Sequence, residues 1–313
     1  MKEILQKQTL TSTKWKKLIR TGQLVFLPLA LGWLLYFIWR AHHTVISVIE
    51  NAHPSYLVAA IAGWCLLHLI SPVFVVTTLN GCGARIRYRD ALRVHVLNLP
   101  ARYLPGGIWH SVGRAIDFYG QGVARNQLAT FFLLENALAA AITLMLGGAC
   151  VWYFRATDEW SKIAFLGALA AALVLVLVPT LFRHSALARF SIMSYAKSVS
   201  VMLIFWFVAA ATFILFTHSF PTAIYSASFF EVGGAYLFSW GIGYISFFAP
   251  QGLGVFEAVA GGVLRSVLSF GEIVSIVAGF RIIVLFADVI AWTFGVMAVK
   301  LSQKKTLLLD RRG

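Results

Sequence analysis

Residues 247–257 read Phe-Phe-Ala-Pro-Gln-Gly-Leu-Gly-Val-Phe-Glu, and they place a proline and two glycines inside a long apolar region. An earlier segment, residues 103–109, has the same character and reads Tyr-Leu-Pro-Gly-Gly-Ile-Trp. A helix that breaks in hydrocarbon leaves backbone groups unpaired, so such a break survives only inside protein or beside a water-filled cavity. Paired interruptions in the two halves of a chain point to the binding site of a transporter.

The composition is that of a polytopic membrane protein. Of the 313 residues, 59% are hydrophobic and 12% are charged, and the mean hydropathy is +0.80. Soluble domains average about 45–50% apolar and about 25% charged residues. The net charge of +14 does not indicate a nucleic-acid partner, because the basic residues occur in short clusters between apolar runs. The three cysteines form no metal-binding or disulfide pattern, and we predict no metal and no cofactor.

The apolar runs predict an all-α fold of about eight membrane-spanning helices, with both termini in the cytoplasm. The predicted spans are residues 23–40, 55–79, 127–153, 163–182, 199–217, 227–248, 252–269 and 273–299. Lysines and arginines concentrate in the segments that this topology leaves on the cytoplasmic side, as the positive-inside rule requires.

The domain organisation follows from the same pattern. Residues 1–22 are a basic cytoplasmic segment, residues 23–299 are one transmembrane domain, and residues 300–313 are a basic cytoplasmic tail. Residues 94–112 are apolar but too interrupted to cross, so we expect them to re-enter the membrane from the cytoplasmic side. The two interrupted segments also suggest an inverted repeat of two halves.

Several ionisable residues fall within apolar segments, where each costs at least about 2.5–3.5 kcal/mol at mid-membrane. They are Arg102, Arg114, Asp117, Glu135, Glu231, Glu257, Arg265, Arg281 and Asp288. Arg114 with Asp117, and Arg281 with Asp288, are candidate ion pairs that neutralise each other and hold helices in register. Arg265 is expected to extend its charge to the interface.

The two breaks favour an anionic ligand. A half-helix that begins after each break directs free N–H groups and a partial positive charge inward. Glycines permit close backbone approach, and arginines supply a fork that fits a phosphate. The predicted substrate-binding residues are Arg102, Pro105, Gly106, Gly107, Arg114, Glu135, Pro250, Gly252, Gly254, Glu257 and Arg281. Glu257 and Asp288 are the candidate proton carriers.

These segments resemble a known family. Residues 104–107, followed by Gly113-Arg114 and the helix with Glu135, look like the first signature of the lysylphosphatidylglycerol synthase transmembrane region (flippase-like) family. Residues 249–257 look like its second signature, Pro-x-Gly-x-Gly-x-x-Glu, and Arg281 resembles the arginine that follows it. The resemblance covers roughly residues 20–300. Gln251 and Asn136 depart from it, at positions where glycine and arginine are common.

The resemblance implies a location in the inner membrane and a function in lipid movement. In the name-giving branch this region moves an aminoacylated phospholipid between leaflets, while a separate soluble domain attaches the amino acid. This sequence has no such soluble domain, so aminoacyl transfer is not implied. Related stand-alone members are linked to envelope or surface-polysaccharide assembly, which implies a polyprenyl-phosphate-linked sugar as another cargo.

We therefore expect a non-enzymatic translocase for an anionic phospholipid or a polyprenyl-phosphate-linked glycan precursor. The sequence lacks a Gly-x-x-x-x-Gly-Lys-Ser/Thr motif, so movement is expected to be passive or coupled to an ion. One alternative is an intramembrane transferase with His110 as base and Asp117 as acid. Another is a non-catalytic partner of envelope biosynthesis enzymes. Homo-oligomer formation is a further hypothesis about partners.

Overall fold

The computed structural model is helical throughout the residues that it describes, and no strand occurs among them. These residues are 50, 52–103, 109–155, 158–183, 190–220, 227–246 and 254–310. Five of the described helices are long and apolar enough to cross a membrane. The chain is therefore a multi-pass, all-α membrane protein, as its composition predicts.

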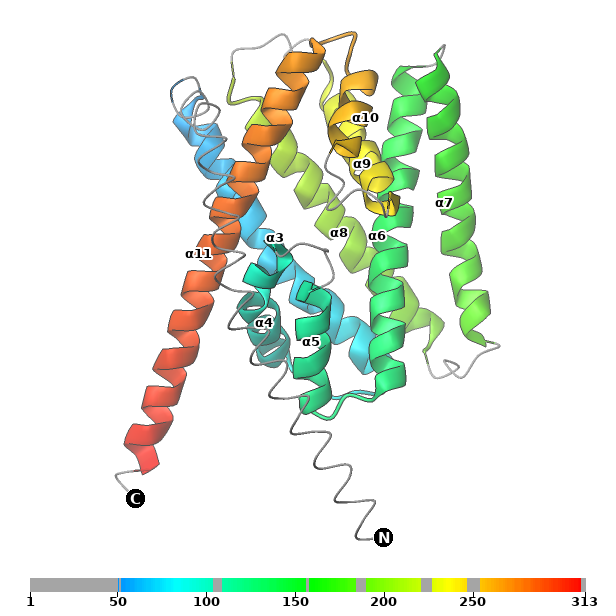
Figure 1. Ribbon diagram of the computed structural model, residues 1–313. Helices are drawn as coiled ribbons and strands as arrows, with labels where there is room; N and C mark the ends of the chain where they lie inside the picture. The colour runs from blue at the N-terminus through cyan, green and yellow to red at the C-terminus, as the bar shows by residue number, and fades with distance from the viewer. Residues whose placement is uncertain are drawn as a thin grey trace.

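The helices follow one another with short connections (Figure 1). They are α3 (Pro54–Gly81), α4 (Tyr88–Leu97), the 3₁₀ helix η1 (Leu99–Tyr103), α5 (Trp109–Gly120), α6 (Arg125–Phe154), α7 (Glu159–Arg183), α8 (Ile192–Thr217), α9 (Phe229–Ile245), α10 (Val255–Val263) and α11 (Phe270–Asp310). The five helices of spanning length are α3, α6, α7, α8 and α11.

The spanning helices give the bundle two ends, which we call upper and lower as they stand in Figure 1. At the upper end α3 begins where α8 finishes, and the His53 N–H donates to the Ser219 carbonyl at 2.7 Å. At the lower end α3 finishes where α6 begins, and the Gln127 side chain donates to the Cys82 carbonyl at 3.0 Å. Helix α11 starts at the upper end and runs down past the lower end (Figure 1).

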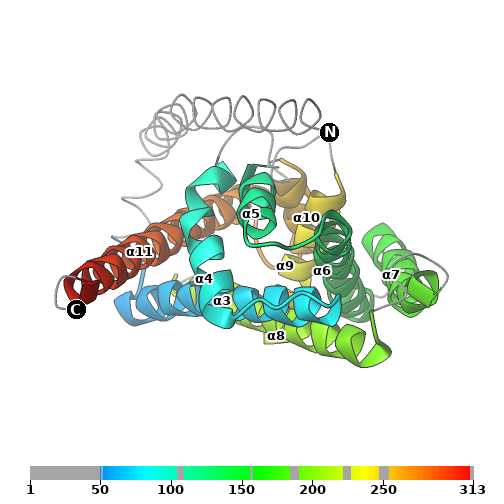
Figure 2. The ribbon, with the colours of Figure 1, turned by 90° about the horizontal axis from the view of Figure 1, so that it is seen from below.

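Short helices form two hairpins that enter the bundle from opposite ends (Figure 1). The lower hairpin, α4–η1–α5, lies on one side of α3, between α11 and the lower end of α6 (Figures 1 and 2). The upper hairpin, α9–α10, has both outer ends at the upper end. The Phe229 ring lies 5.1 Å from that of His218, and Arg155 donates to the Val263 carbonyl at 2.8 Å. Each hairpin therefore brings short helices into the interior of the bundle.

Capping sequences explain where several helices begin at the upper end. Ser228 accepts from the Glu231 N–H at the start of α9, and Ser269 and Glu272 cap each other at the start of α11. Asp158 accepts from the Ser161 N–H at the start of α7 and pairs with Arg155. Burial alone would raise the pKa of Asp158, but these hydrogen bonds outweigh it and hold the pKa below its ordinary value.

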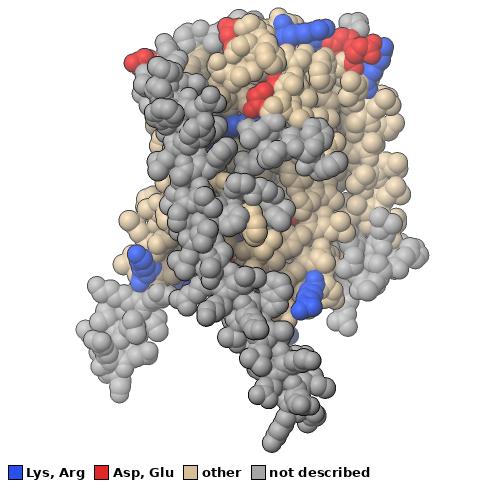
Figure 3. Space-filling view, viewed as in Figure 1, with Lys and Arg blue, Asp and Glu red and all other residues tan. Residues whose placement is uncertain are grey.

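The surface agrees with a membrane setting. Helix α7 lies at the periphery of the bundle beside α6 (Figure 2). It exposes a row of large apolar side chains, among them Leu166 (63%), Leu169 (59%), Leu173 (56%) and Val176 (68%). Soluble monomers rarely expose patches of this kind, whereas lipid is the expected neighbour of such a helix. In Figure 3 charged side chains of both signs gather at the upper end, and most of the described belt below them is uncharged.

The described helices confirm five of the predicted spans, those at 55–79, 127–153, 163–182, 199–217 and 273–299. The region 94–112 contains only short helices in its described part, as expected for a segment that does not cross. The predicted first span and residues 1–22 lie outside the described residues. The inverted repeat and the total number of crossings stay predictions.

The predicted seventh span, residues 252–269, is not a crossing helix. Helix α10 has nine residues and is about 14 Å long, whereas the hydrocarbon core is about 30 Å thick. The predicted sixth span corresponds to the 17-residue α9, which ends part-way along α6 (Figure 1). The two elements together enter and leave at the upper end. The apolar run was long enough for two spans, but the chain reverses inside the bundle.

Small residues set the close packing of α6 against α9. A Cβ atom at Gly147 would overlap the backbone of Phe238, and a Cβ atom at Gly234 would overlap Cys150. Membrane helices approach closely where small residues face each other. The upper hairpin is thus held directly against a spanning helix.

Replacing Gly147 with valine is expected to destabilise the protein, because the branched side chain meets backbone atoms that cannot move independently of α9. We expect a lower midpoint of thermal unfolding in detergent by several degrees. Gly120→Ala is the matched control, because a Cβ atom at Gly120 has no neighbour within 4 Å. An unchanged midpoint for Gly147→Val would contradict the close packing of α6 and α9.

Candidate functional site

Three ion pairs lie in the interior, and each joins a residue of a hairpin to a residue of a spanning helix. They are Arg102 of η1 with Asp288 of α11, Arg114 of α5 with Glu135 of α6, and Glu257 of α10 with Arg281 of α11. Buried charges of this kind are tolerated when they are paired and hydrogen-bonded. We take these three pairs as the candidate site.

The Arg114–Glu135 pair is bidentate. The Arg114 Nη1 atom donates to Glu135 Oε1 at 2.9 Å, and its Nη2 atom pairs with Oε2. The Arg114 side chain is 2% exposed, and its guanidinium carbon lies 5.2 Å from the Phe131 ring centre and 5.4 Å from that of Phe132. A fork-to-carboxylate pair over aromatic faces fixes the lower hairpin to α6.

Glu257 has two tasks at the start of α10. Its Oε1 atom lies 3.0 Å from Arg281 Nη2, and its Oε2 atom accepts from the Gly254 N–H at 2.8 Å. Gly254 has a φ of +81°, a conformation that L side chains rarely adopt, and this explains the glycine at the residue before the helix. The carboxylate therefore caps α10 and ties it to α11.

Asp288 is the most extensively bound carboxylate of the three. Its side chain is 2% exposed. The Oδ2 atom accepts from the Tyr103 hydroxyl at 2.8 Å and from Arg102 Nη1 at 3.3 Å. The Oδ1 atom accepts from Trp64 Nε1 at 3.1 Å and lies 2.9 Å from His68 Nε2. Asp288 thus connects α11 with α3 and with η1 of the lower hairpin.

Two buried histidines extend this cluster. His68 Nδ1 lies 3.1 Å from His95 Nε2, and His95 Nδ1 lies 3.4 Å from the Ser71 hydroxyl. The His110 ring, on α5, is 5.7 Å from that of His95. Within the described part of the chain, His110 Nε2 and Arg114 Nε are buried and have no hydrogen-bond partner.

Shared elements link the three pairs. Helix α11 carries both Asp288 and Arg281, and α5 carries Arg114 together with His110, whose ring lies 5.7 Å from that of His95. The Arg102 side chain is 40% exposed, whereas its partner Asp288 is buried. The charges of the site are spread over four helices, α5, α6, α10 and α11, and the 3₁₀ helix η1.

The predicted ion pairs within single helices are wrong. Arg114 pairs with Glu135 instead of Asp117, which is exposed and accepts from the Asn98 amide at 2.8 Å. Arg281 pairs with Glu257 instead of Asp288. Residues seven apart on a helix are separated by about 10 Å along its axis, so a partner on another helix is closer.

The remaining predicted site residues have mixed outcomes. Gly254 takes part, through its N–H and its positive φ. The predicted residues Pro105, Gly106, Gly107, Pro250 and Gly252 lie outside the described residues. Of the other charged candidates, Glu231 lies in the first turn of α9, where its N–H donates to Ser228, and Arg265 is 64% exposed near Asp158, so both lie at the upper end and outside the site.

Sequence reasoning missed His68 and His95. His68 lies in the middle of a predicted span, where any ionisable residue is a functional candidate. Its position in that apolar run could therefore have marked it as a site residue. His95 lies in the short helix α4 next to a run of arginines, and nothing in its local sequence distinguishes it. Their pairing depends on the crossing of α3 and α4.

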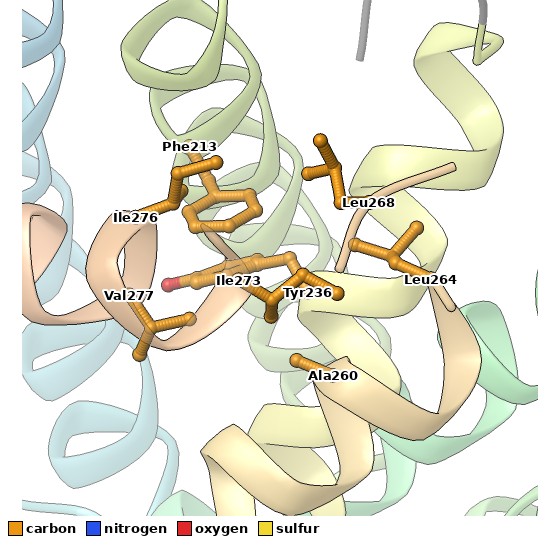
Figure 4. A pocket seen from close by; sticks show the side chains of 8 residues that line it. All are labelled: Phe213, Tyr236, Ala260, Leu264, Leu268, Ile273, Ile276 and Val277. Atoms are coloured by element: carbon orange, nitrogen blue, oxygen red, sulfur yellow. The ribbon is translucent and has the colours of Figure 1, made fainter. Parts of the chain in front are cut away.

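A small pocket near the upper hairpin is lined by apolar side chains (Figure 4). Phe213 and Tyr236 stack there, with ring centres 4.7 Å apart. In Figure 4 the Tyr236 hydroxyl points past Val277 and away from Leu264 and Leu268. The pocket offers no charged group to a ligand, so we assign the candidate site to the ion pairs.

The fold and site define a class: a multi-pass membrane protein in which two hairpins of short helices are tied to spanning helices by interior ion pairs. No family model matches the chain. No curated protein matches it either.

Replacing Glu135 with leucine is expected to destabilise the fold by about 3–5 kcal/mol, because it leaves Arg114 buried without its anion. The double variant Arg114→Leu with Glu135→Leu is expected to be more stable than either single variant. Urea or SDS unfolding of the purified protein measures this difference. Asp117→Asn is the control and is expected to change little, since Asp117 is exposed. Additive losses in the double variant would contradict the pair.

Proposed function

We propose that this protein is a non-enzymatic translocase that moves an anionic lipid between the leaflets of a bilayer. The observation that carries the proposal is the set of three interior ion pairs that join the hairpins to the spanning helices. The polar head group would pass along these residues while the acyl chains stay in the surrounding lipid.

The chemistry of the pairs suits a phosphate. Each arginine already holds a carboxylate, and a phosphate oxygen makes the same charge-assisted hydrogen bonds to a guanidinium. A lipid phosphate that takes the place of Glu257 or Glu135 therefore keeps the arginine paired. The displaced carboxylate then has to bind a proton or reach water, because an unpaired charge in a low-dielectric interior is costly.

Two unpartnered donors support the same ligand class. Arg114 Nε and His110 Nε2 are buried without partners among the described residues, and they lie four residues apart on α5. Positions i and i+4 share a face of a helix. Buried polar atoms without partners mark places where a ligand or water supplies the missing bond.

The hairpins offer a physical route for alternating access. They enter from opposite ends, and each is attached to spanning helices by ion pairs that a head group can replace (Figure 1). Exchange at Arg281 would loosen the upper hairpin, and exchange at Arg114 would loosen the lower one. Discontinuous helices near the bilayer midplane serve this role in known transporter folds.

The proposal also includes the orientation of the protein in the membrane and the class of lipid that it moves. The lower end carries Arg85, Arg87, Arg89 and Arg93 around the α3–α4 connection, which favours the cytoplasm. The resemblance to the lysylphosphatidylglycerol synthase transmembrane region family favours a phospholipid or a polyprenyl-phosphate-linked sugar. A place in envelope or surface-polysaccharide biogenesis in the inner membrane is part of the proposal.

The direct test is movement of a fluorescent phosphatidylglycerol or polyprenyl phosphate between leaflets of proteoliposomes. We expect the native chain to accelerate it and Glu257→Gln to slow it at least tenfold, because Arg281 loses its charged, exchangeable partner. Glutamine can still accept from the Gly254 N–H, so the cap of α10 is expected to remain. Glu159→Gln is the matched control. Glu159 is 81% exposed at the upper end, and its pair with Lys162 is at the surface.

A variant that swaps the two charges of one pair distinguishes an effect on lipid movement from an effect on folding. Glu257→Arg with Arg281→Glu keeps the pair but changes which helix carries each charge. We expect this variant to fold better than Glu257→Arg alone, while lipid movement stays low because the arginine has left α11. No movement of either probe by folded native protein would refute the proposed function.

A further inference from the structure

The buried histidine pair, His68 with His95, has no role in the ion pairs described above, although it adjoins one of them. The two imidazoles come from different helices, α3 and α4, and are 4% and 6% exposed. Their facing nitrogens are 3.1 Å apart, within hydrogen-bond distance. A pair of neutral imidazoles in this position satisfies one donor and one acceptor and leaves one nitrogen able to accept a proton.

One orientation of hydrogens fits the hydrogen bonds of the cluster. The Ser71 hydroxyl donates to His95 Nδ1 at 3.4 Å, and His95 Nε2–H donates to His68 Nδ1 at 3.1 Å. His68 Nε2 lies 2.9 Å from Asp288 Oδ1, close enough for an ion pair, but it makes no hydrogen bond among the described residues.

We propose that the His68–His95 pair is a proton-binding site that couples the movement of one proton to the movement of one anionic head group. This inference rests on the proposed function, since it names the ion that drives the lipid. The site consists of the two imidazoles, with Asp288 as the fixed anion on one side and Ser71 on the other.

The proton transfer balances without any further reactant. A hydronium ion gives a proton to the lone pair of His95 Nδ1 and becomes water, and His95 becomes an imidazolium. The His95 Nε2–H bond then breaks, and that proton forms a bond to His68 Nδ1. The result is a neutral His95 and a charged His68 beside Asp288. Asp288 stays ionised, because Tyr103, Trp64 and Arg102 also donate to it.

Charge balance supplies the coupling. Without the proton, Arg102 and Asp288 cancel, and the group is neutral. With the proton, the group carries one positive charge in a low-dielectric interior, which is costly. A head group with a single negative charge restores neutrality. Proton and anion therefore bind more strongly together than either binds alone, and binding linkage of this kind is reciprocal.

Other charged and titratable groups near the histidine pair contribute to the charge of this region. The lower hairpin contributes Arg102 and Tyr103 from η1, and His110 and Arg114 from α5; α3 contributes Cys65, and α9 contributes Tyr236. Arg114 is neutralised by Glu135, and Arg102 by Asp288. Burial, and then the neighbouring His68 and Arg114, hold the pKa of the His95 imidazole below its ordinary value. A bound anion would raise it and so favour uptake of the proton.

The first experiment tests the coupling in proteoliposomes with fluorescent phosphatidylglycerol as the probe. We impose a pH difference of one unit and, separately, a potassium–valinomycin potential. Since one pH unit corresponds to a tenfold ratio, coupling of one proton to one lipid predicts up to tenfold accumulation of the probe in one leaflet. The joint movement is electroneutral, so the membrane potential alone is expected to have no effect.

The variants are His68→Gln and His95→Gln, with His53→Gln as the control. Glutamine keeps a hydrogen-bonding side chain but binds no proton in this range. His53 is exposed at the upper end, far along α3 from the pair. We expect both interior variants to move the probe without responding to the pH difference, and the control to behave as the native chain. Native movement that ignores the pH difference overturns the proposal.

A second measurement does not depend on lipid movement. Nitrogen-15 NMR of the imidazoles in nanodiscs, assigned with the two variants, follows protonation from pH 8 to pH 5. We expect one proton to be shared by His68 and His95, and His68→Gln to alter the titration of His95. If neither imidazole binds a proton in this range, the site is refuted even where lipid movement is found. Titration without lipid movement refutes the proposed function and leaves the proton site standing.

Discussion

The organising constraint is the cost of holding charge in a medium that cannot solvate it. Arg114, buried at 2% side-chain exposure, is tolerable only because Glu135 meets it with a two-point contact. The same reasoning applies to Asp288, which receives donors from Trp64, Tyr103 and Arg102. These contacts decide where the short helices are placed, because each hairpin has to bring its charge to the partner on a spanning helix.

A helix that stops in the interior creates a second constraint, since its first N–H groups need acceptors. At α10 the chain meets it with Glu257, which caps the helix through Gly254 and pairs with Arg281 at the same time. Local backbone chemistry and long-range electrostatics are thus satisfied by one side chain. Because Glu257 makes both contacts, a change that removes it from Arg281 also affects its hydrogen bond to the start of α10.

The paired charges also explain how an interior of this kind can be both stable and responsive. Each pair is neutral as it stands, so the resting protein does not carry a large internal field. Under the proposed function, joint uptake of a proton and an anion keeps that neutrality, whereas an anion alone would add a charge to a neutral pair. The proton thus keeps the energy of the loaded protein close to that of the empty one, which a carrier requires if it is to release its cargo.

The sequence by itself determined much of this protein. Its apolar runs located five helices of spanning length, and six ionisable residues of the site stood out because they lay in those runs or in the interrupted segments. The sequence did not determine which charges pair. Arg114 and Asp117 lie three residues apart on one helix and could pair, yet Asp117 is exposed and accepts from the Asn98 amide. The reversal of α9 and α10 inside the bundle and the meeting of His68 with His95 were likewise decided by the tertiary structure. The physical reason is that hydropathy reports how costly a residue is in water, whereas the partner of a buried charge depends on which helices cross and at what depth.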